Sequence, residues 1–218
     1  RTVLVDTTAP VFADAESDNR PRITSESVTG ENQRVWYKNQ TIKLEGQLTE
    51  ANGIESIKYS IDDGKSYSIC DYSRIDNGAV YEFSANIPVE KTWENKIITI
   101  QAIDSVGNAQ KKEITVNVDR TDPTIKITSD TSNIIIGSNT GLTLGLDCDD
   151  AESGVKSVKA KIGSPVFDEP DAKLEKPESD EPDAKPESDY FTSLTISSDK
   201  FANYSGDMGT VFLQIEDN

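Results

Sequence analysis

The stretch QTIKLEGQLTEANGIESIKYSI (residues 40–61) decides the fold, because its apolar side chains alternate with polar ones. The alternating apolar positions are Ile42, Leu44 and Leu48 in the first run, and Ile57, Tyr59 and Ile61 in the second. A period of two indicates a β-strand with one buried face. The stretch therefore predicts two strands that each turn one side toward a core.

The same alternation returns along the chain in both directions. Three further runs lie in the first half, at residues 81–87, 98–102 and 114–118, and four in the second half, at residues 142–146, 158–162, 194–196 and 211–215. DDGK (residues 62–65), DNG (76–78) and VGN (106–108) separate runs with residues that tolerate positive φ. No stretch has a sustained apolar period of 3.6 residues. Short strands at this spacing predict an all-β chain of two-sheet sandwiches.

The chain also repeats itself. TVLVDTTAP (residues 2–10) matches TVNVDRTDP (115–123), and TIQAID (99–104) matches FLQIED (212–217), both at a shift of 113 residues. Between them, residues 40–61 resemble residues 140–162 at a shift of 100 or 101. A loop that is shorter in the second copy reduces the shift locally, and a loop that is longer further along restores it. We interpret the chain as one domain written twice.

The positions at which the matching segments begin and end predict the domain boundaries. Residues 1–5 have the sequence of the last strand of a preceding repeat, and residues 6–118 form a complete domain. Residues 119–218 form a second domain, which we expect to lack its last strand. We expect the whole to be a fragment of a longer tandem array. A hypothesis follows: residues 1–5, or another chain's copy of them, cover the edge that the missing strand leaves open.

Residues 163–189 differ from the rest. They contain DEPDAK twice and KPESD twice, and such a composition buries too little apolar surface to offset the entropy of ordering. We predict a disordered, acidic, proline-rich insertion on the surface. An acidic docking or cation-capturing loop is the alternative.

Composition excludes several functions. The 218 residues carry 22 basic and 39 acidic side chains, a net charge of −17, and no histidine. The acidic excess argues against nucleic acid and against direct contact with an anionic membrane. Without histidine the commonest general base is missing, and no nucleophile elbow, P-loop or dinucleotide motif occurs. We expect no enzyme activity.

Three motifs together carry a resemblance to a family. They are VDTTAP and VDRTDP at the domain starts, GIESIKYSIDDGKSY and SGVKSVKAKI at the centres, and AIDSVGN and IEDN near the ends. They resemble the tandem bacterial immunoglobulin-like (fibronectin type III-like) repeats of secreted or cell-surface proteins.

The resemblance implies an extracellular protein of the bacterial surface or cell wall, whose partners are the neighbouring repeats of the same chain. It implies a structural spacer that presents a binding or catalytic module away from the surface. The alternatives are an adhesive module for a host protein or glycan, and an accessory region of an extracellular glycosidase.

We expect no cofactor, with calcium as the one candidate that the loops offer. In a sandwich of this kind the loops after the second and sixth strands lie at one end, near the linker that leads into the domain. In the second domain this gathers Asp119, Asp122, Asp149, Asp150, Glu152, Asp217 and Asn218, and in the first the smaller set Asp6, Glu50, Asp104 and Asn108. Calcium takes six to eight oxygen ligands, which such clusters supply. Turn formation and solubility are the alternative roles of these residues.

Two smaller expectations concern cysteines and aromatic residues. Cys70 and Cys148 fall in different domains, so we expect two free thiols. We expect Cys148 to face the core, because it continues the every-second-residue spacing of Leu142, Leu144 and Leu146. A sugar-binding platform is an alternative role for Trp36, Tyr37, Tyr59, Tyr67 and Tyr72, of which Tyr59 has core parity.

Overall fold

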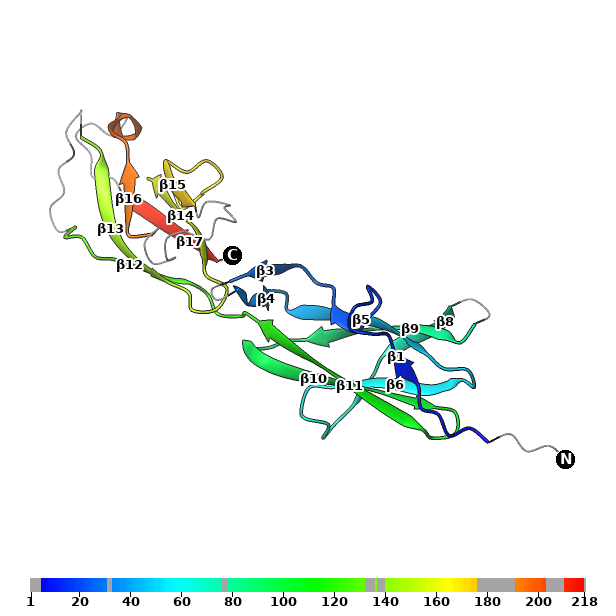
Figure 1. The fold of residues 1–218 in the computed structure, drawn as a ribbon. Helices are drawn as coiled ribbons and strands as arrows, with labels where there is room; N and C mark the ends of the chain where they lie inside the picture. Colours follow the sequence, from blue (N-terminus) through cyan, green and yellow to red (C-terminus); the bar gives the residue numbers. More distant parts are fainter. Residues whose placement is uncertain are drawn as a thin grey trace. The chain divides into compact units, whose positions relative to one another are not determined.

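β-strands make up nearly all the regular structure of the chain (Figure 1). The structure, a computed structural model, describes residues 5–30, 33–75, 78–131, 136, 140–175, 191–202 and 210–217. Besides the single 3-10 residue Gln33, the described helical residues form one short 3-10 turn, Ser198–Phe201, and no described helix has the length and apolarity to cross a membrane. The chain divides into two compact units. Unit 1 is Arg1–Ser27 with Val35–Arg120, and unit 2 is Val28–Arg34 with Thr121–Asn218.

One sheet of unit 1 is built around the first run of alternating residues. Its strands are β1 (Val11–Phe12), β5 (Thr41–Thr49), β9 (Val80–Pro88) and β8 (Asp71–Ile75), in that order, and β2 (Arg22–Ile23) also pairs with β5. All these pairings are antiparallel.

The second sheet of unit 1 contains the order β4-β11-β10-β6-β7. These strands are β4 (Val35–Tyr37), β11 (Ala109–Val118), β10 (Trp93–Asp104), β6 (Ile54–Ser60) and β7 (Ser68–Ile69), and β3 (Ser27–Thr29) precedes β4 in the chain. The chain passes from this sheet to the other at the buried Cys70, between β7 and β8.

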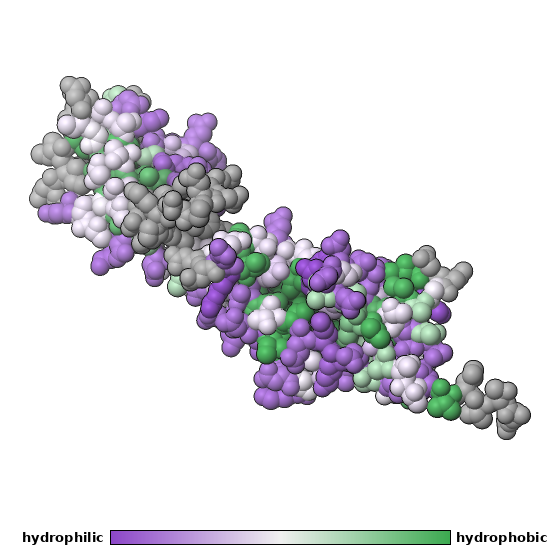
Figure 2. All heavy atoms as spheres, in the orientation of Figure 1, coloured by the Kyte–Doolittle hydropathy of each residue, from purple (hydrophilic) through white to green (hydrophobic). Residues whose placement is uncertain are grey.

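The core of unit 1 lies between the two sheets, as the alternation predicts. Side chains that are completely buried come from both layers: Ile42, Leu44 and Ile87 from one, and Ile57, Ile98, Ile100 and Val118 from the other. Hydrophilic side chains cover much of the visible face of this unit, and apolar ones show between them (Figure 2). The predicted β-sandwich is confirmed.

Unit 2 has two smaller sheets. One has the order β12-β13-β16, with β12 (Thr124–Ile127), β13 (Leu142–Asp149) and β16 (Ser193–Ile196). The other has the order β15-β14-β17, with β15 (Ala172–Glu175), β14 (Val155–Ile162) and β17 (Val211–Asp217). A separate core of Leu142, Leu144, Leu146, Val158, Leu194 and Ile196 joins them.

The predicted disorder of residues 163–189 is wrong for part of that stretch. Ala172–Glu175 forms β15, which pairs with β14 from Ala160↔Ala172 to Ser157↔Glu175. Ala172 and Leu174 pack against the core of unit 2, so this part buries apolar side chains that the overall composition conceals. Residues 176–189 lie outside the described residues, as do residues 1–4 of the predicted preceding strand. Val5 is described and belongs to no strand.

Both thiols are free, as predicted. Cys148 packs against the core of unit 2, in keeping with its parity on β13. Burial raises the pKa of the Cys70 thiol to about 12 and that of Cys148 to about 11, with Asp71 and Asp147 as the respective second causes. Both cysteines are therefore protonated at neutral pH.

Candidate functional site

Strand pairing brings three acidic residues of unit 1 to one end of the sandwich. Asp6 lies in the linker before β1, and Glu50 follows β5 directly. Because Val11 of β1 pairs with Thr49 of β5, the start of the domain and the end of β5 meet. Asp104 ends β10, where it pairs with Ile54 at the start of β6, so the β5–β6 loop lies beside it.

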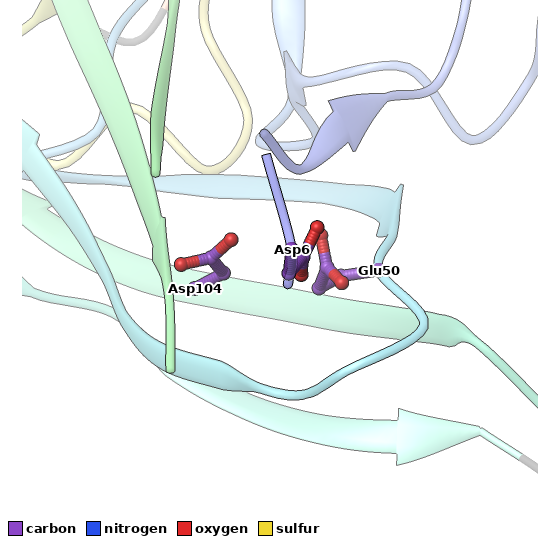
Figure 3. Close-up of side chains that lie close together, drawn as sticks. All are labelled: Asp6, Glu50 and Asp104. Atoms are coloured by element: carbon purple, nitrogen blue, oxygen red, sulfur yellow. The ribbon is translucent and has the colours of Figure 1, made fainter. Parts of the chain in front are cut away.

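The three carboxylates converge, as Figure 3 shows. One carboxylate oxygen of each of Asp6, Glu50 and Asp104 lies within 4.8 Å of the other two. Asp104 is completely buried, Glu50 is 4% exposed and Asp6 is half-buried. The expected gathering of this smaller acidic set at one end of the first domain is therefore seen in the structure.

Two asparagines tie the N-terminal linker to this end. The Asn108 Nδ2 donates to Asp104 Oδ2 at 2.7 Å and to the main-chain oxygens of Asp6 and Thr8 at 3.3 and 3.2 Å. The Asn52 Nδ2 donates to Asp6 Oδ2 at 2.8 Å. Asn108 was in the predicted set, but Asn52 was not. Its position in the turn NG (residues 52–53) was the signal that could have pointed to it.

Hydrogen bonds hold two of the carboxylates in their charged form. The Thr8 hydroxyl is the largest cause that lowers the pKa of Asp6, followed by the Thr8 backbone N–H and the Asn52 side chain. Burial acts to raise the pKa of Asp104, but donation by the Asn108 side chain and by the backbone N–H groups of Val106, Asn108 and Gly107 outweighs it, so this pKa is lowered.

In the described part of the chain, no cationic side chain pairs with this cluster. Among the described residues, none of the three carboxylates forms an ion pair with Lys or Arg. Glu50 Oε1 accepts from the Asn52 backbone N–H at 2.8 Å, and its other oxygen has no hydrogen-bond partner in the described part of the chain. Buried charges in proteins are usually paired or bound to a metal. Three hard oxygen donors around one point suit a calcium ion.

The acidic residues predicted for the second domain are divided between the units. Asp119 belongs to unit 1, where its backbone N–H donates to the Tyr37 oxygen at 2.8 Å. Asp122, Asp149, Asp150, Glu152 and Asp217 belong to unit 2. Asn218 lies outside the described residues.

Register gathers much of this set at one end of unit 2. Thr124, two residues after Asp122, pairs with Asp149, and Asp217 pairs with Val155, which follows the loop of Asp150 and Glu152. Glu152 N–H donates to Asp150 Oδ1 at 3.1 Å.

The repeat relates the two acidic sets position by position. A shift of 113 residues takes Asp6 to Asp119 and Asp104 to Asp217, and the local shift of 100 takes Glu50 to Asp150. Both copies of the domain therefore have a carboxylate at the three positions that converge in unit 1.

The aromatic residues do not form one exposed platform. Trp36 and Tyr59 are buried, and Tyr59 belongs to the core of unit 1. The Tyr72 hydroxyl donates to the Glu55 oxygen at 3.0 Å. Tyr59 packs inside the sandwich as its core parity predicts, so the structure speaks against the alternative of one sugar-binding platform.

A polar groove of about 410 Å³ lies over β5, β8 and β9 of unit 1. Charged and polar side chains dominate its lining, among them Arg20, Arg22, Glu45, Asp71 and Glu82.

Comparisons with known proteins give similarity to solved structures only. No family model and no curated protein matches the chain. Among solved structures, it is similar to fibronectin(III)-like modules of Clostridium thermocellum CbhA, with 17% identity, a TM-score of 0.31, and coverage of 66% of this chain and 69% of that one.

Two mouse proteins are similar at the same level. The ectodomain (Ig1–Ig3) of nectin-like molecule 4 shows 14% identity and a TM-score of 0.37, covering 88% of this chain and 56% of that one. CEACAM1b shows 11% identity and a TM-score of 0.31, covering 90% and 92%. At these values the fold rests on the sheets described above, and function has to be argued from the site.

Proposed function

We propose that this chain is a structural segment of a bacterial extracellular protein, in which immunoglobulin-like units act as spacers and calcium braces the linker that leads into each unit. The observation that carries the proposal is the convergence of Asp6, Glu50 and Asp104, two of them buried, without a cationic partner among the described residues. A calcium ion there neutralises the cluster and fixes the linker to the domain end.

The architecture supports a spacer. Each unit has its own core, so each can fold beside any neighbour. The segments that lead into the domains, residues 6–9 and 119–122, are short and are followed by Pro10 and Pro123, which restrict the backbone. Location at the bacterial surface, with neighbouring repeats as partners, rests on the sequence resemblance.

Calcium titration of the metal-free chain tests the proposal. We expect binding in the range of extracellular modules, a Kd of about 10⁻⁴ to 10⁻³ M, and a rise in the melting temperature of unit 1 that a chelator reverses. Glu50→Gln removes one charged ligand and is expected to weaken binding about tenfold or more.

Glu55→Gln is the matched control, since Glu55 is an exposed residue of β6 in the same unit. It should bind calcium like the unchanged chain. Equal melting temperatures with calcium and with chelator, or equal affinities for the two variants, would contradict the calcium brace.

Adhesion is the second candidate, because of the polar groove over β5, β8 and β9. A glycan or a host protein that binds there should lose affinity when Arg22 and Glu82 are replaced by alanine. Binding to a glycan array that survives both replacements would exclude this groove as the adhesive surface.

A further inference from the structure

The outer edge of β17 has no partner in the described part of unit 2. β17 pairs with β14 from Ile162↔Val211 to Val155↔Asp217. It is the last strand in the order β15-β14-β17, so its backbone groups on the far side meet no described strand. Such an edge is a template for pairing with another strand.

Unit 1 contains the same strand with that edge covered. β17 corresponds to β10 through the repeat of TIQAID and FLQIED. β10 is paired on both sides, with β6 on one and with β11 on the other. The pairs with β11 run from Ile98↔Ile114 to Ile103↔Ala109. Unit 1 therefore shows which kind of strand fits beside β17.

Burial reveals the consequence of the open edge. Ile98, Ile100 and Ala102 of β10 are 0% exposed. Their counterparts on β17 are Val211, Leu213 and Ile215, which pack against the core of unit 2 but remain partly exposed. A strand beside β17 would cover apolar surface that is buried in the other copy of the domain.

β17 also lacks the usual protection of an edge. Its first five residues, VFLQI, contain no charge and no proline. The edge strand β8 of unit 1, in contrast, is exposed along most of its length and carries Asp71 and Arg74. Proteins protect free edges with charges, prolines or short strands, and an edge without them favours strand addition.

We propose that the free edge of β17 binds one antiparallel strand with the sequence pattern of β11. If the added strand keeps the register of β11 against β10, its residues equivalent to 109–114 of β11 pair with residues 216–211 of β17. The pattern places Ile114 toward the core and Thr115 toward solvent.

Charge favours this occupant. Residues 121–218 contain twenty acidic and eight basic side chains, and β11 contains Lys111 and Lys112 against the single acidic residue Glu113. A basic strand is therefore attracted to unit 2, whereas a second copy of the acidic β17 is repelled.

A synthetic peptide of residues 105–118 added to the full chain tests this proposal. We expect saturable 1:1 binding, weaker at high salt, with slower amide hydrogen exchange in residues 212–217 and unchanged exchange in β10, whose edges are already paired. A peptide with Ile114→Asp is expected to bind at least about tenfold more weakly, because it buries a charge. The matched control Thr115→Asp is expected to change affinity less than about threefold, because the residue faces solvent.

Three results would overturn the proposal. The first is equal binding of the two substituted peptides, and the second is no protection of β17 at saturating peptide. The third is a concentration-dependent dimer of the chain alone, seen by sedimentation, in which β17 is already protected. That result would make a second copy of the chain the occupant.

Discussion

Gly46 illustrates, at the scale of single residues, how closely side chains of neighbouring strands pack within one sheet of unit 1. A Cβ atom at this position would lie 2.7 Å from the Phe83 ring and 2.9 Å from the Pro21 Cα. Gly46 continues the core-facing positions Ile42 and Leu44 on β5, and its missing side chain leaves the space that the Phe83 ring fills. A glycine in the middle of a strand is explained here by packing.

Gly46→Ala should therefore destabilise unit 1 by about 1–3 kcal/mol through overpacking. The control is Gly78→Ala, because no atom lies within 4 Å of a Cβ built there, and its effect should stay within about 0.5 kcal/mol. Urea unfolding of the two variants measures both values. Equal stability of the two would contradict the described approach of Phe83 to β5.

Cys70 gives a second test at this scale, through pH. Burial, and to a smaller extent the charge of Asp71, raises the pKa of the folded Cys70 thiol to about 12. An unfolded cysteine has a pKa of about 8.5. Stability from the protonated thiol is complete below the unfolded pKa. As the pH rises above it, the unfolded chain alone loses the proton, so the free energy of unfolding falls by about 1.4 kcal/mol per pH unit.

Cys70→Ala removes this contribution. We therefore expect the unfolding free energy of unit 1 to fall more steeply between pH 9 and pH 10 in the unchanged chain than in the variant, since all other titrating groups are shared. Parallel pH profiles would show that the thiol is accessible in the folded state.

At the scale of elements, the period of two identified the long strands well. β5, β6, β9, β10 and β11 of unit 1, and β13, β14, β16 and β17 of unit 2, lie where alternation predicts them. The five-residue strand β8, DYSRI, was not predicted because it is mostly exposed and shows no apolar alternation, and the two-residue strands β1, β2 and β7 were not predicted either. Two-residue strands have too little sequence for a period, and their pairing depends on residues far along the chain.

The candidate site was predictable for a similar reason. Asp6, Glu50, Asp104 and Asn108 follow from the rule that certain loops of a sandwich share one end. Alternation and loop position say nothing about distances between side chains, so neither the convergence of the carboxylates nor the bond from Asn52 could be predicted. In unit 2, composition suggested disorder across residues 163–189, and the two apolar residues of β15 were too few to change that average.

β15 provides a prediction for this scale. Leu174 packs against the core of unit 2, so Leu174→Asp should destabilise that unit by about 1–3 kcal/mol. Lys173 is exposed on the same strand, and Lys173→Gln should have an effect below about 0.5 kcal/mol. Thermal unfolding followed by circular dichroism compares them. Equal melting temperatures would show that β15 contributes nothing to the unit.

At the scale of the whole molecule, the repeat produces two cores and an uneven distribution of charge. The core of unit 1 contains Ile42, Leu44 and Ile100, and that of unit 2 contains Leu144, Val158 and Leu194. Residues 121–218 hold most of the net charge of −17, since their acidic side chains exceed their basic ones by twelve. Such a segment carries a high net charge, and its two separate cores lead us to expect that each unit folds independently.

Differential scanning calorimetry of the full chain and of two core variants tests this account most directly. Leu44→Ala and Leu194→Ala each remove a buried side chain, at a cost of about 2–5 kcal/mol. If the units fold independently, the unchanged chain shows two transitions, Leu44→Ala lowers only one of them, and Leu194→Ala lowers only the other. A single transition that both variants shift equally would show one cooperative domain and contradict the division into two sandwiches.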